Sequence, residues 1–218
     1  MQSLIFDCDG VLVDSEKLSC EAWLPVLARQ GVHIALSEMD QFVGRSDRAV
    51  LEYYRPRTGR PLPDELIGER EREYFELAAG RVHPYPGLLD ALAALRERGA
   101  RLAVASSGRP EKIRFNLSQA GLTEYFQVMC SVTQVQRGKP APDVFLEAAA
   151  QLGVRAESCV VIEDSRFGIQ AARAAEMTAI GFCSTYPADQ LREAGAQYVF
   201  ESYADLVPLL DEASQSAT

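Results

Sequence analysis

The chain has 218 residues, of which 47% are hydrophobic and 24% are charged, a composition typical of a globular protein that buries a core. Its net charge of −9 disfavours nucleic acids and anionic membranes as partners, because binding to them requires clustered Lys and Arg. Acidic residues occur too early for a signal peptide, and no run approaches the roughly 18 apolar residues of a membrane span. We therefore expect a cytoplasmic protein, with a monomer as the default state.

Short apolar runs alternate with amphipathic segments of helical length, which predicts βα units around a mainly parallel sheet. The predicted strands are residues 3–6, 101–105, 128–131, 159–162, 178–182 and 198–200. Helices are predicted between them at residues 87–98, 110–120, 142–152, 167–175 and 188–194. The predicted fold class is therefore α/β.

Residues 16–80 interrupt this alternation, because they contain several helical patterns, including 20–30 and 64–79, but no convincing strand. The interruption follows Asp14 and ends at a proline-rich segment, residues 83–87, in which the prolines favour extended backbone. We predict a core domain of residues 1–14 and 85–218, and an inserted all-helical domain of residues 15–84.

The strongest chemical signal lies near the start of the chain, where an apolar strand runs directly into Asp7, Cys8, Asp9 and Gly10. The carboxyl ends of parallel strands border the ligand crevice of an open sheet, so both carboxylates are predicted to face a substrate. Gly10 permits a sharp turn because it has no Cβ. A turn rich in aspartate is the structural alternative for this segment alone.

The segment DCDGVLVDSE, residues 7–16, resembles the first motif of haloacid dehalogenase superfamily phosphatases. This resemblance implies a Rossmann-like parallel-sheet core with an inserted helical cap. Three later segments resemble the family's other motifs in the expected order, each at a strand end or a helix start: Ser106-Ser107-Gly108, Lys139 within GKPAPD, and Glu163-Asp164 after an apolar run. Each segment alone is a weak signal, but the four together are specific.

The resemblance also implies a role for each of these residues. Asp7 would be the nucleophile that takes the phosphoryl group, and Asp9 the general acid and base. Lys139 would be a fixed positive charge against the phosphoryl oxygens. The implied catalytic residues are Asp7, Asp9, Ser106 and Lys139, and the implied phosphate-binding residues are Ser106, Ser107, Gly108 and Lys139.

A magnesium ion is the expected cofactor. Adjacent carboxylates at Glu163 and Asp164, close to those of the first motif, would repel one another unless a cation lies among them. Ligands that are all oxygen atoms suit Mg²⁺ rather than zinc. By analogy, the ligands would be the Asp7 side chain, the Asp9 backbone carbonyl and Asp164, with Glu163 as a further direct or indirect ligand.

The helical insertion resembles the mobile cap that the family places after its first motif. Arg45 and Arg48, beside a turn glycine, are the candidate substrate-binding residues of this cap, although a helix start capped by Ser46 explains the same pattern. The cap type points to a small phosphorylated metabolite, either a sugar phosphate or a phosphorylated sugar acid.

Three alternative functions share parts of this pattern. Sugar phosphomutases related to β-phosphoglucomutase have similar core motifs, but Ser19 and Asp47 stand where those enzymes carry a cap histidine and a cap arginine. These departures favour hydrolysis. A catalytically idle partner-binding protein is disfavoured because every chemical position is intact. A metal-free dehalogenase would not need the Asp9 and Asp164 arrangement.

Overall fold

The computed structural model describes residues 3–43, 47–59 and 61–216, which form two compact units. One unit comprises the chain up to Asp14 and from His83 onwards, and the other comprises Ser15–Val82. The core unit therefore resumes two residues before the position that the sequence predicts. Within the described ranges, no helix is both long and apolar enough to cross a membrane.

The core unit contains a six-stranded sheet in the order β3-β2-β1-β4-β5-β6, and all neighbouring strands are parallel. Each predicted strand is present within one residue at either end, which confirms the Rossmann-like α/β fold. Its strand order reverses between β1 and β4, where such folds bind ligands. The strands are β1 (Ser3–Phe6), β2 (Arg101–Ser106), β3 (Val128–Ser131), β4 (Cys159–Glu163), β5 (Thr178–Phe182) and β6 (Tyr198–Phe200).

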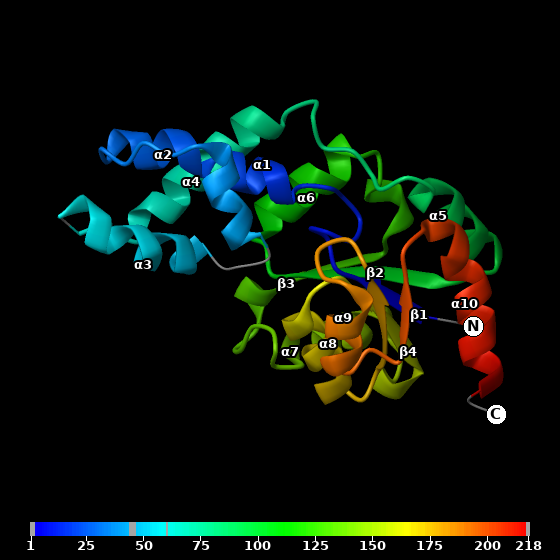
Figure 1. Ribbon diagram of the computed structural model, residues 1–218. Coiled ribbons are helices and arrows are strands. Elements are labelled where there is room, and N and C mark those ends of the chain that lie inside the picture. The colour runs from blue at the N-terminus through cyan, green and yellow to red at the C-terminus, as the bar shows by residue number, and fades with distance from the viewer. Residues whose placement is uncertain (1–2, 44–46, 60, 217–218) are drawn as a thin grey trace. The chain divides into compact units, whose positions relative to one another are not determined.

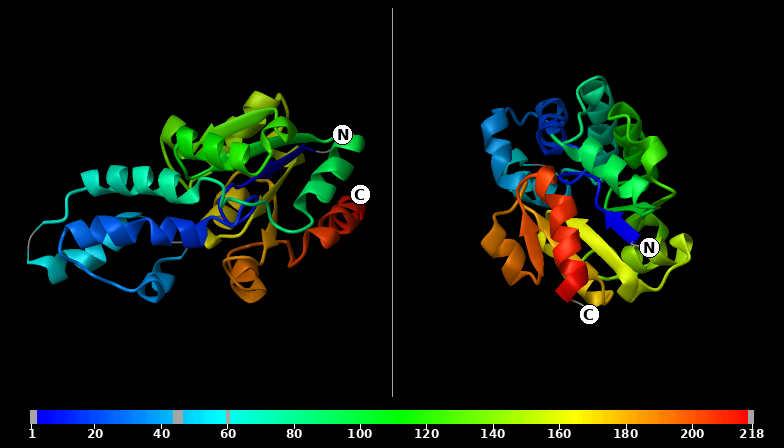
Figure 2. Two further views of the ribbon diagram at one scale, coloured as in Figure 1. Left: turned by 90° about the horizontal axis from the view of Figure 1, so that it is seen from above. Right: turned by 90° about the vertical axis from the view of Figure 1, so that its right-hand side faces the viewer.

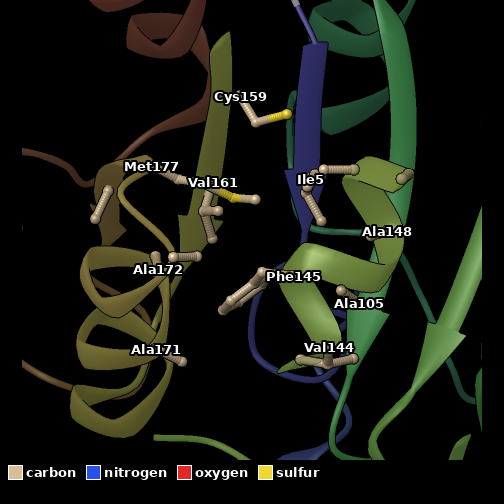
Figure 3. Packing of buried hydrophobic residues seen from close by; sticks show 14 of the residues in the cluster. Ile5, Ala105, Val144, Phe145, Ala148, Cys159, Val161, Ala171, Ala172 and Met177 are labelled. Atoms are coloured by element: carbon tan, nitrogen blue, oxygen red, sulfur yellow. The ribbon is translucent and has the colours of Figure 1, made fainter. Parts of the chain in front are cut away.

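Helices cover both faces of this sheet, which explains why its strands read as continuous apolar runs (Figure 1). On one face, α7 (Asp143–Leu152), α8 (Arg166–Ala174) and α9 (Ala188–Glu193) enclose a hydrophobic core. Figure 3 shows Phe145 of α7 lying in this core between its own helix and the helix that carries Ala171 and Ala172.

The connections from β1 to β2 and from β2 to β3 run in the opposite direction across the sheet, so right-handed crossovers place their helices on the other face. These helices are α5 (Leu88–Glu97) and α6 (Pro110–Gln119), and α10 (Leu206–Ser216) packs against α5. The sequence pattern predicts no helix after residue 194, but the buried Leu206 and Leu210 anchor α10 in the core. Short 3-10 turns connect elements at Thr123–Tyr125, Val132–Gln134, Ala156–Ser158 and Tyr203–Asp205.

Among the described residues of the second unit, every regular element is a helix, and the unit has its own core (Figure 2). Its elements are α1 (Glu16–Glu21), α2 (Trp23–Arg29), the 3-10 helix η1 (Leu36–Phe42), α3 (Asp47–Thr58) and α4 (Glu65–Ala78). Trp23, Met39, Leu51 and Leu66 are among the side chains buried between them.

Candidate active site

The core segments singled out from the sequence meet at the carboxyl end of the sheet. Asp7 follows β1, Ser106 ends β2, and Glu163 ends β4 with Asp164 directly after it. Because β1 lies between β2 and β4, these three strand ends are neighbours. Lys139 reaches the same place from the segment between β3 and α7.

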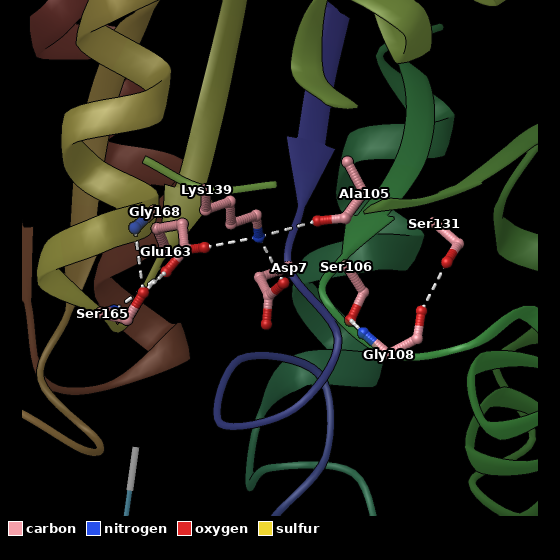
Figure 4. A network of polar contacts seen from close by, with 9 residues as sticks. All are labelled: Asp7, Ala105, Ser106, Gly108, Ser131, Lys139, Glu163, Ser165 and Gly168. Carbon is pink, nitrogen blue, oxygen red and sulfur yellow. Dashed lines mark hydrogen bonds and ion pairs between the residues drawn. The ribbon is translucent and has the colours of Figure 1, made fainter. Parts of the chain in front are cut away.

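The Lys139 ammonium group lies between two carboxylates (Figure 4). Its Nζ donates hydrogen bonds to Asp7 Oδ1 at 2.6 Å, to Glu163 Oε1 at 2.7 Å and to the Ala105 carbonyl oxygen at 3.0 Å. An ammonium group has three N–H donors, so these three acceptors can use all of them. Only 4% of the Lys139 side chain is exposed, so it is a fixed internal charge rather than a solvated surface group.

Burial raises the pKa of Asp7 to about 7, although the Lys139 charge opposes the shift; the charges of Glu163 and Asp9 add to it. Burial lowers the pKa of Lys139, but Asp7 and Glu163 outweigh this effect and leave the pKa above its usual range. The cluster thus holds more negative than positive charge when Asp7 is ionised. A further cation beside Asp7 would favour its ionised form.

Both carboxylate oxygens of Glu163 are engaged. Oε1 accepts from Lys139, and Oε2 accepts from the Ser165 backbone N–H at 2.9 Å and from the Ser165 hydroxyl at 2.8 Å. Ser165 Oγ in turn accepts from the Gly168 N–H and caps α8. A Cβ on Gly168 would lie 1.8 Å from Glu163 Cδ, so only glycine permits this arrangement. These bonds disfavour Glu163 as a direct metal ligand and make it a partner of Lys139.

Asp164 lies against the turn that follows β1. A Cβ on Gly10 would lie 2.1 Å from Asp164 Oδ2, and Gly10 has a φ of +78°, which a residue without Cβ adopts easily. The Ser184 hydroxyl donates to the Gly10 carbonyl oxygen, and the Tyr203 hydroxyl donates to the Val11 carbonyl oxygen at 2.7 Å. The backbone of this turn is therefore held beside the Asp164 carboxylate.

These oxygen donors fit a Mg²⁺ ion. Asp7 and Asp164 are both buried, and the absence of a side chain at Gly10 allows Asp164 to approach the turn that contains Asp9. Among the residues that the structure describes, no three His, Cys, Asp or Glu side chains are grouped to hold a metal ion, as a closed zinc site would require. Mg²⁺ needs only one or two carboxylates when phosphate and water complete its octahedron.

The predicted phosphate-binding segment forms a turn at the end of β2. Ser106 is buried, Ser107 is exposed, and the Ser106 hydroxyl accepts from the Gly108 N–H at 3.2 Å. The Ser131 hydroxyl donates to the Gly108 carbonyl oxygen at 2.6 Å and fixes the far side of the turn. Because α6 begins at Pro110, its positive N-terminal end lies next to these groups.

Two side chains of α6 that the sequence analysis did not single out bind the Asp9 carboxylate. Lys112 Nζ lies 2.9 Å from Asp9 Oδ1, and Asn116 Nδ2 donates to the same oxygen at 3.0 Å. The two residues are one helical turn apart and so share a face of α6. That spacing is visible in the sequence, but the residue that this face meets depends on the packing of α6 against the loop after β1.

Cys8, between the two aspartates, is not a competing nucleophile. Burial, together with the charges of Asp9 and Asp7, raises the pKa of its thiol well above the usual range. The reactive form of cysteine is the thiolate, so Cys8 remains an unreactive thiol.

Of the two candidate cap arginines, Arg45 lies outside the described residues. Arg48 is exposed on α3, and its Nη2 lies 2.5 Å from Asp64 Oδ2. The neighbouring Asp47 accepts a hydrogen bond from Trp23 Nε1 at 3.1 Å and lies 3.2 Å from Nη2 of Arg70, which is 8% exposed. A substrate contact by Arg45 or Arg48 stays a prediction.

The parallel-sheet fold and the acidic residues around Lys139 are consistent with a single family of hydrolases. The chain belongs to the haloacid dehalogenase-like hydrolase family, whose model matches residues 4–182. This confirms the resemblance seen in the motifs.

Similar proteins include a phosphatase, a chloroplast protein and a solved structure with bound phosphate. The chain is 34% identical to the fructose-1-phosphate phosphatase YqaB of Escherichia coli (strain K12), over 81% of this chain and 94% of that protein. It is 32% identical, over 94% of its length, to Protein SUPPRESSOR OF QUENCHING 1, chloroplastic, of Arabidopsis thaliana, and the match spans 20% of that protein. A crystal structure of a HAD family hydrolase from Deinococcus radiodurans R1, with bound phosphate and sodium, has a TM-score of 0.79 and 35% identity, covering 98% of this chain and 96% of that one.

Proposed function

We propose that the protein is a magnesium-dependent phosphatase that hydrolyses a phosphorylated sugar or sugar acid through an aspartyl-phosphate on Asp7. The observation that carries this proposal is the buried Asp7 carboxylate at the end of the central strand, 2.6 Å from the Lys139 ammonium group. Further support comes from the Escherichia coli relative, a fructose-1-phosphate phosphatase, and from the phosphate bound to the Deinococcus radiodurans protein.

In the first step, an Asp7 oxygen attacks phosphorus, and the bond from phosphorus to the sugar oxygen breaks. Lys139 balances negative charge on the transferring oxygens, while the Ser106 hydroxyl and the N–H groups after it bind the others. Asp9 donates a proton to the sugar oxygen, which leaves as an alcohol. When bound by Asp7, Asp164 and the Asp9 carbonyl, Mg²⁺ would supply further positive charge against the phosphoryl group.

In the second step, a water molecule attacks phosphorus of the aspartyl-phosphate, and Asp9 takes the proton of that water. The bond from phosphorus to the Asp7 oxygen breaks, which restores the carboxylate and releases inorganic phosphate. In this proposal the helical unit, Ser15–Val82, acts as a cap that excludes bulk water during the first step.

Transfer to water is favoured over transfer to a second sugar hydroxyl. The position of the mutase cap histidine is occupied by Ser19, and the position of the mutase cap arginine is occupied by Asp47, which is engaged by Trp23 and Arg70. Incubation with β-glucose 1-phosphate distinguishes the two reactions. We expect glucose and phosphate, whereas accumulation of glucose 6-phosphate would identify a mutase.

The experiment that tests the phosphatase compares phosphate release from fructose 1-phosphate by the wild type, Asp7→Asn and Asp14→Asn. Asp14 is an exposed carboxylate in the same segment and is the matched control. We expect Mg²⁺-dependent release by the wild type and by Asp14→Asn, no release by Asp7→Asn, and a phosphoryl adduct on the wild-type peptide that contains Asp7. Equal release by wild type and Asp7→Asn would overturn the proposal.

A further inference from the structure

The helix α6 holds Oδ1 of the Asp9 carboxylate. Both Lys112 Nζ, at 2.9 Å, and Asn116 Nδ2, at 3.0 Å, approach Oδ1. The Asp9 and Lys112 side chains are only 15% and 11% exposed, and Asn116 is fully buried. Hydrogen bonds to a charged group in such a shielded setting are stronger and more directional than those at the surface. The rotamer of Asp9 is therefore set by α6.

The other oxygen of Asp9 lies on the side of the phosphate-binding turn. A Cβ built on Gly108 would be 3.7 Å from Asp9 Oδ2, 3.6 Å from Ser106 Oγ and 3.6 Å from Ile113 Cγ1, so Oδ2 and the Ser106 hydroxyl lie on the same side of Gly108. The hydroxyl of Ser106 and the N–H groups after it are the proposed phosphate contacts. An oxygen bonded to the phosphorus held there would lie close to Oδ2.

We propose that Lys112 and Asn116 are positioning residues that fix Oδ1 of Asp9, so that Oδ2 meets the leaving oxygen of the substrate. The proposal rests on the proposed phosphatase function, in which Asp9 protonates that oxygen. It assigns no contact with substrate to either residue, because both act through Asp9. Without them, the Asp9 side chain samples other rotamers, and proton transfer loses its aligned donor.

Two substrates that differ in their need for a proton provide the test. The sugar oxygen of fructose 1-phosphate leaves as an alkoxide unless it is protonated, whereas p-nitrophenolate leaves without a proton. We expect Lys112→Met to lower kcat/KM for fructose 1-phosphate by roughly 10- to 100-fold. For p-nitrophenyl phosphate, we expect kcat/KM of Lys112→Met to stay within about twofold of the wild-type value. With this substrate, phosphoryl transfer to Asp7 needs no proton from Asp9.

Matched variants separate positioning from a general effect on the fold. Arg114→Met removes an exposed cation from the same helix and is expected to leave both substrates unaffected. Asn116→Ser, which retains Lys112, is expected to show the same substrate selectivity as Lys112→Met, and Lys112→Arg is expected to recover most of the lost activity. Thermal unfolding midpoints identify folded variants, and either folded variant at Lys112 or Asn116 suffices for the test.

A double-mutant cycle with Asp9→Asn decides whether Lys112 acts through Asp9. We expect Lys112→Met to cause no further loss for fructose 1-phosphate in the Asp9→Asn background. Two results would indicate a direct phosphate contact of Lys112 and overturn the positioning role. One is that Lys112→Met lowers kcat/KM equally for both substrates, and the other is that it lowers kcat/KM by the full factor in the Asp9→Asn background. Absence of Asp7-dependent phosphate release by the wild type from either substrate would instead overturn the phosphatase function itself.

Discussion

Lys139 Nζ lies 2.6 Å from Asp7 Oδ1, although 132 residues separate the two in the chain. The sheet order produces this contact, because the segment after β3 crosses the sheet to reach β4 and passes the carboxyl end of β1 on the way. The Asp7 carboxylate and its counter-charge therefore come from segments of the core unit that are far apart in the chain. Their contact therefore requires that β1 and the segment after β3 are both in place.

Binding of Mg²⁺ is expected to release a proton in a pH-dependent manner. The pKa of Asp7 is about 7 in the absence of a metal ion, so Asp7 is largely protonated at pH 6 and ionised at pH 8.5. A cation binds the ionised form, so binding releases about one proton at the lower pH and almost none at the higher. Calorimetric titration in buffers of different ionisation enthalpy measures this number. Asp7→Asn is the control, and a proton count that is the same at both pH values would contradict the prediction.

Replacing Gly168 by alanine is expected to disturb the site through Glu163. The new Cβ would lie 1.8 Å from Glu163 Cδ and displace the carboxylate that binds Lys139. We expect a loss of about 1–3 kcal/mol in the free energy of unfolding, measured by circular dichroism in urea, and slower phosphate release.

Gly68→Ala is the matched control for this change. Gly68 lies inside α4, and a Cβ there would meet no atom within 4 Å. Because alanine favours a helix over glycine, the control is expected to gain about 0.4–1 kcal/mol in stability without a change in activity. Equal effects of the two substitutions would indicate that the Glu163 contact is unimportant.

Replacing Gly10 by alanine is expected to weaken Mg²⁺ binding. Gly99→Ala provides the comparison, because both glycines have positive φ, +78° and +73°, but only at Gly10 does a Cβ meet Asp164, at 2.1 Å from its Oδ2. We expect the free energy of unfolding to fall by about 1–2 kcal/mol in both variants, because alanine is strained at a positive φ. Only Gly10→Ala should also raise the Mg²⁺ concentration that gives half-maximal phosphate release. An unchanged Mg²⁺ dependence would argue against Asp164 as a ligand.

The helical unit is expected to depend on Asp47 for stability. Asp47→Ala leaves the buried Arg70 without this carboxylate and removes the acceptor of Trp23 Nε1. We expect the free energy of unfolding of the helical unit to fall by on the order of 2 kcal/mol or more. Fluorescence of Trp23, the single tryptophan of the chain, measures it. Asp64→Ala, which removes only exposed ion pairs with Arg48 and Arg55, should have a much smaller effect.

The sequence predicts the six strands and the core motifs because their signals are local: apolar runs, and polar residues at the ends of those runs. It does not predict that Glu163 binds Lys139 and Ser165, because that geometry depends on the close approach of Gly168. The sequence also does not predict the contact of Lys112 with Asp9, because an amphipathic pattern does not specify which loop the polar face of a helix will contact. The helix α10 is not predicted either, and it is anchored by two buried leucines, Leu206 and Leu210.

The strand that precedes Asp7, β1, is paired along its whole length with β2 on one side and β4 on the other. The Asp7 N–H continues the pairing with β4 by donating to the Ile162 carbonyl oxygen at 3.0 Å. The backbone of Asp7 is thus fixed by the two strands beside β1, and the proposed nucleophile cannot move away without loss of that pairing. The Asp9 carboxylate, in contrast, is held by the side chains of Lys112 and Asn116, so its position is expected to depend on α6 rather than on the sheet.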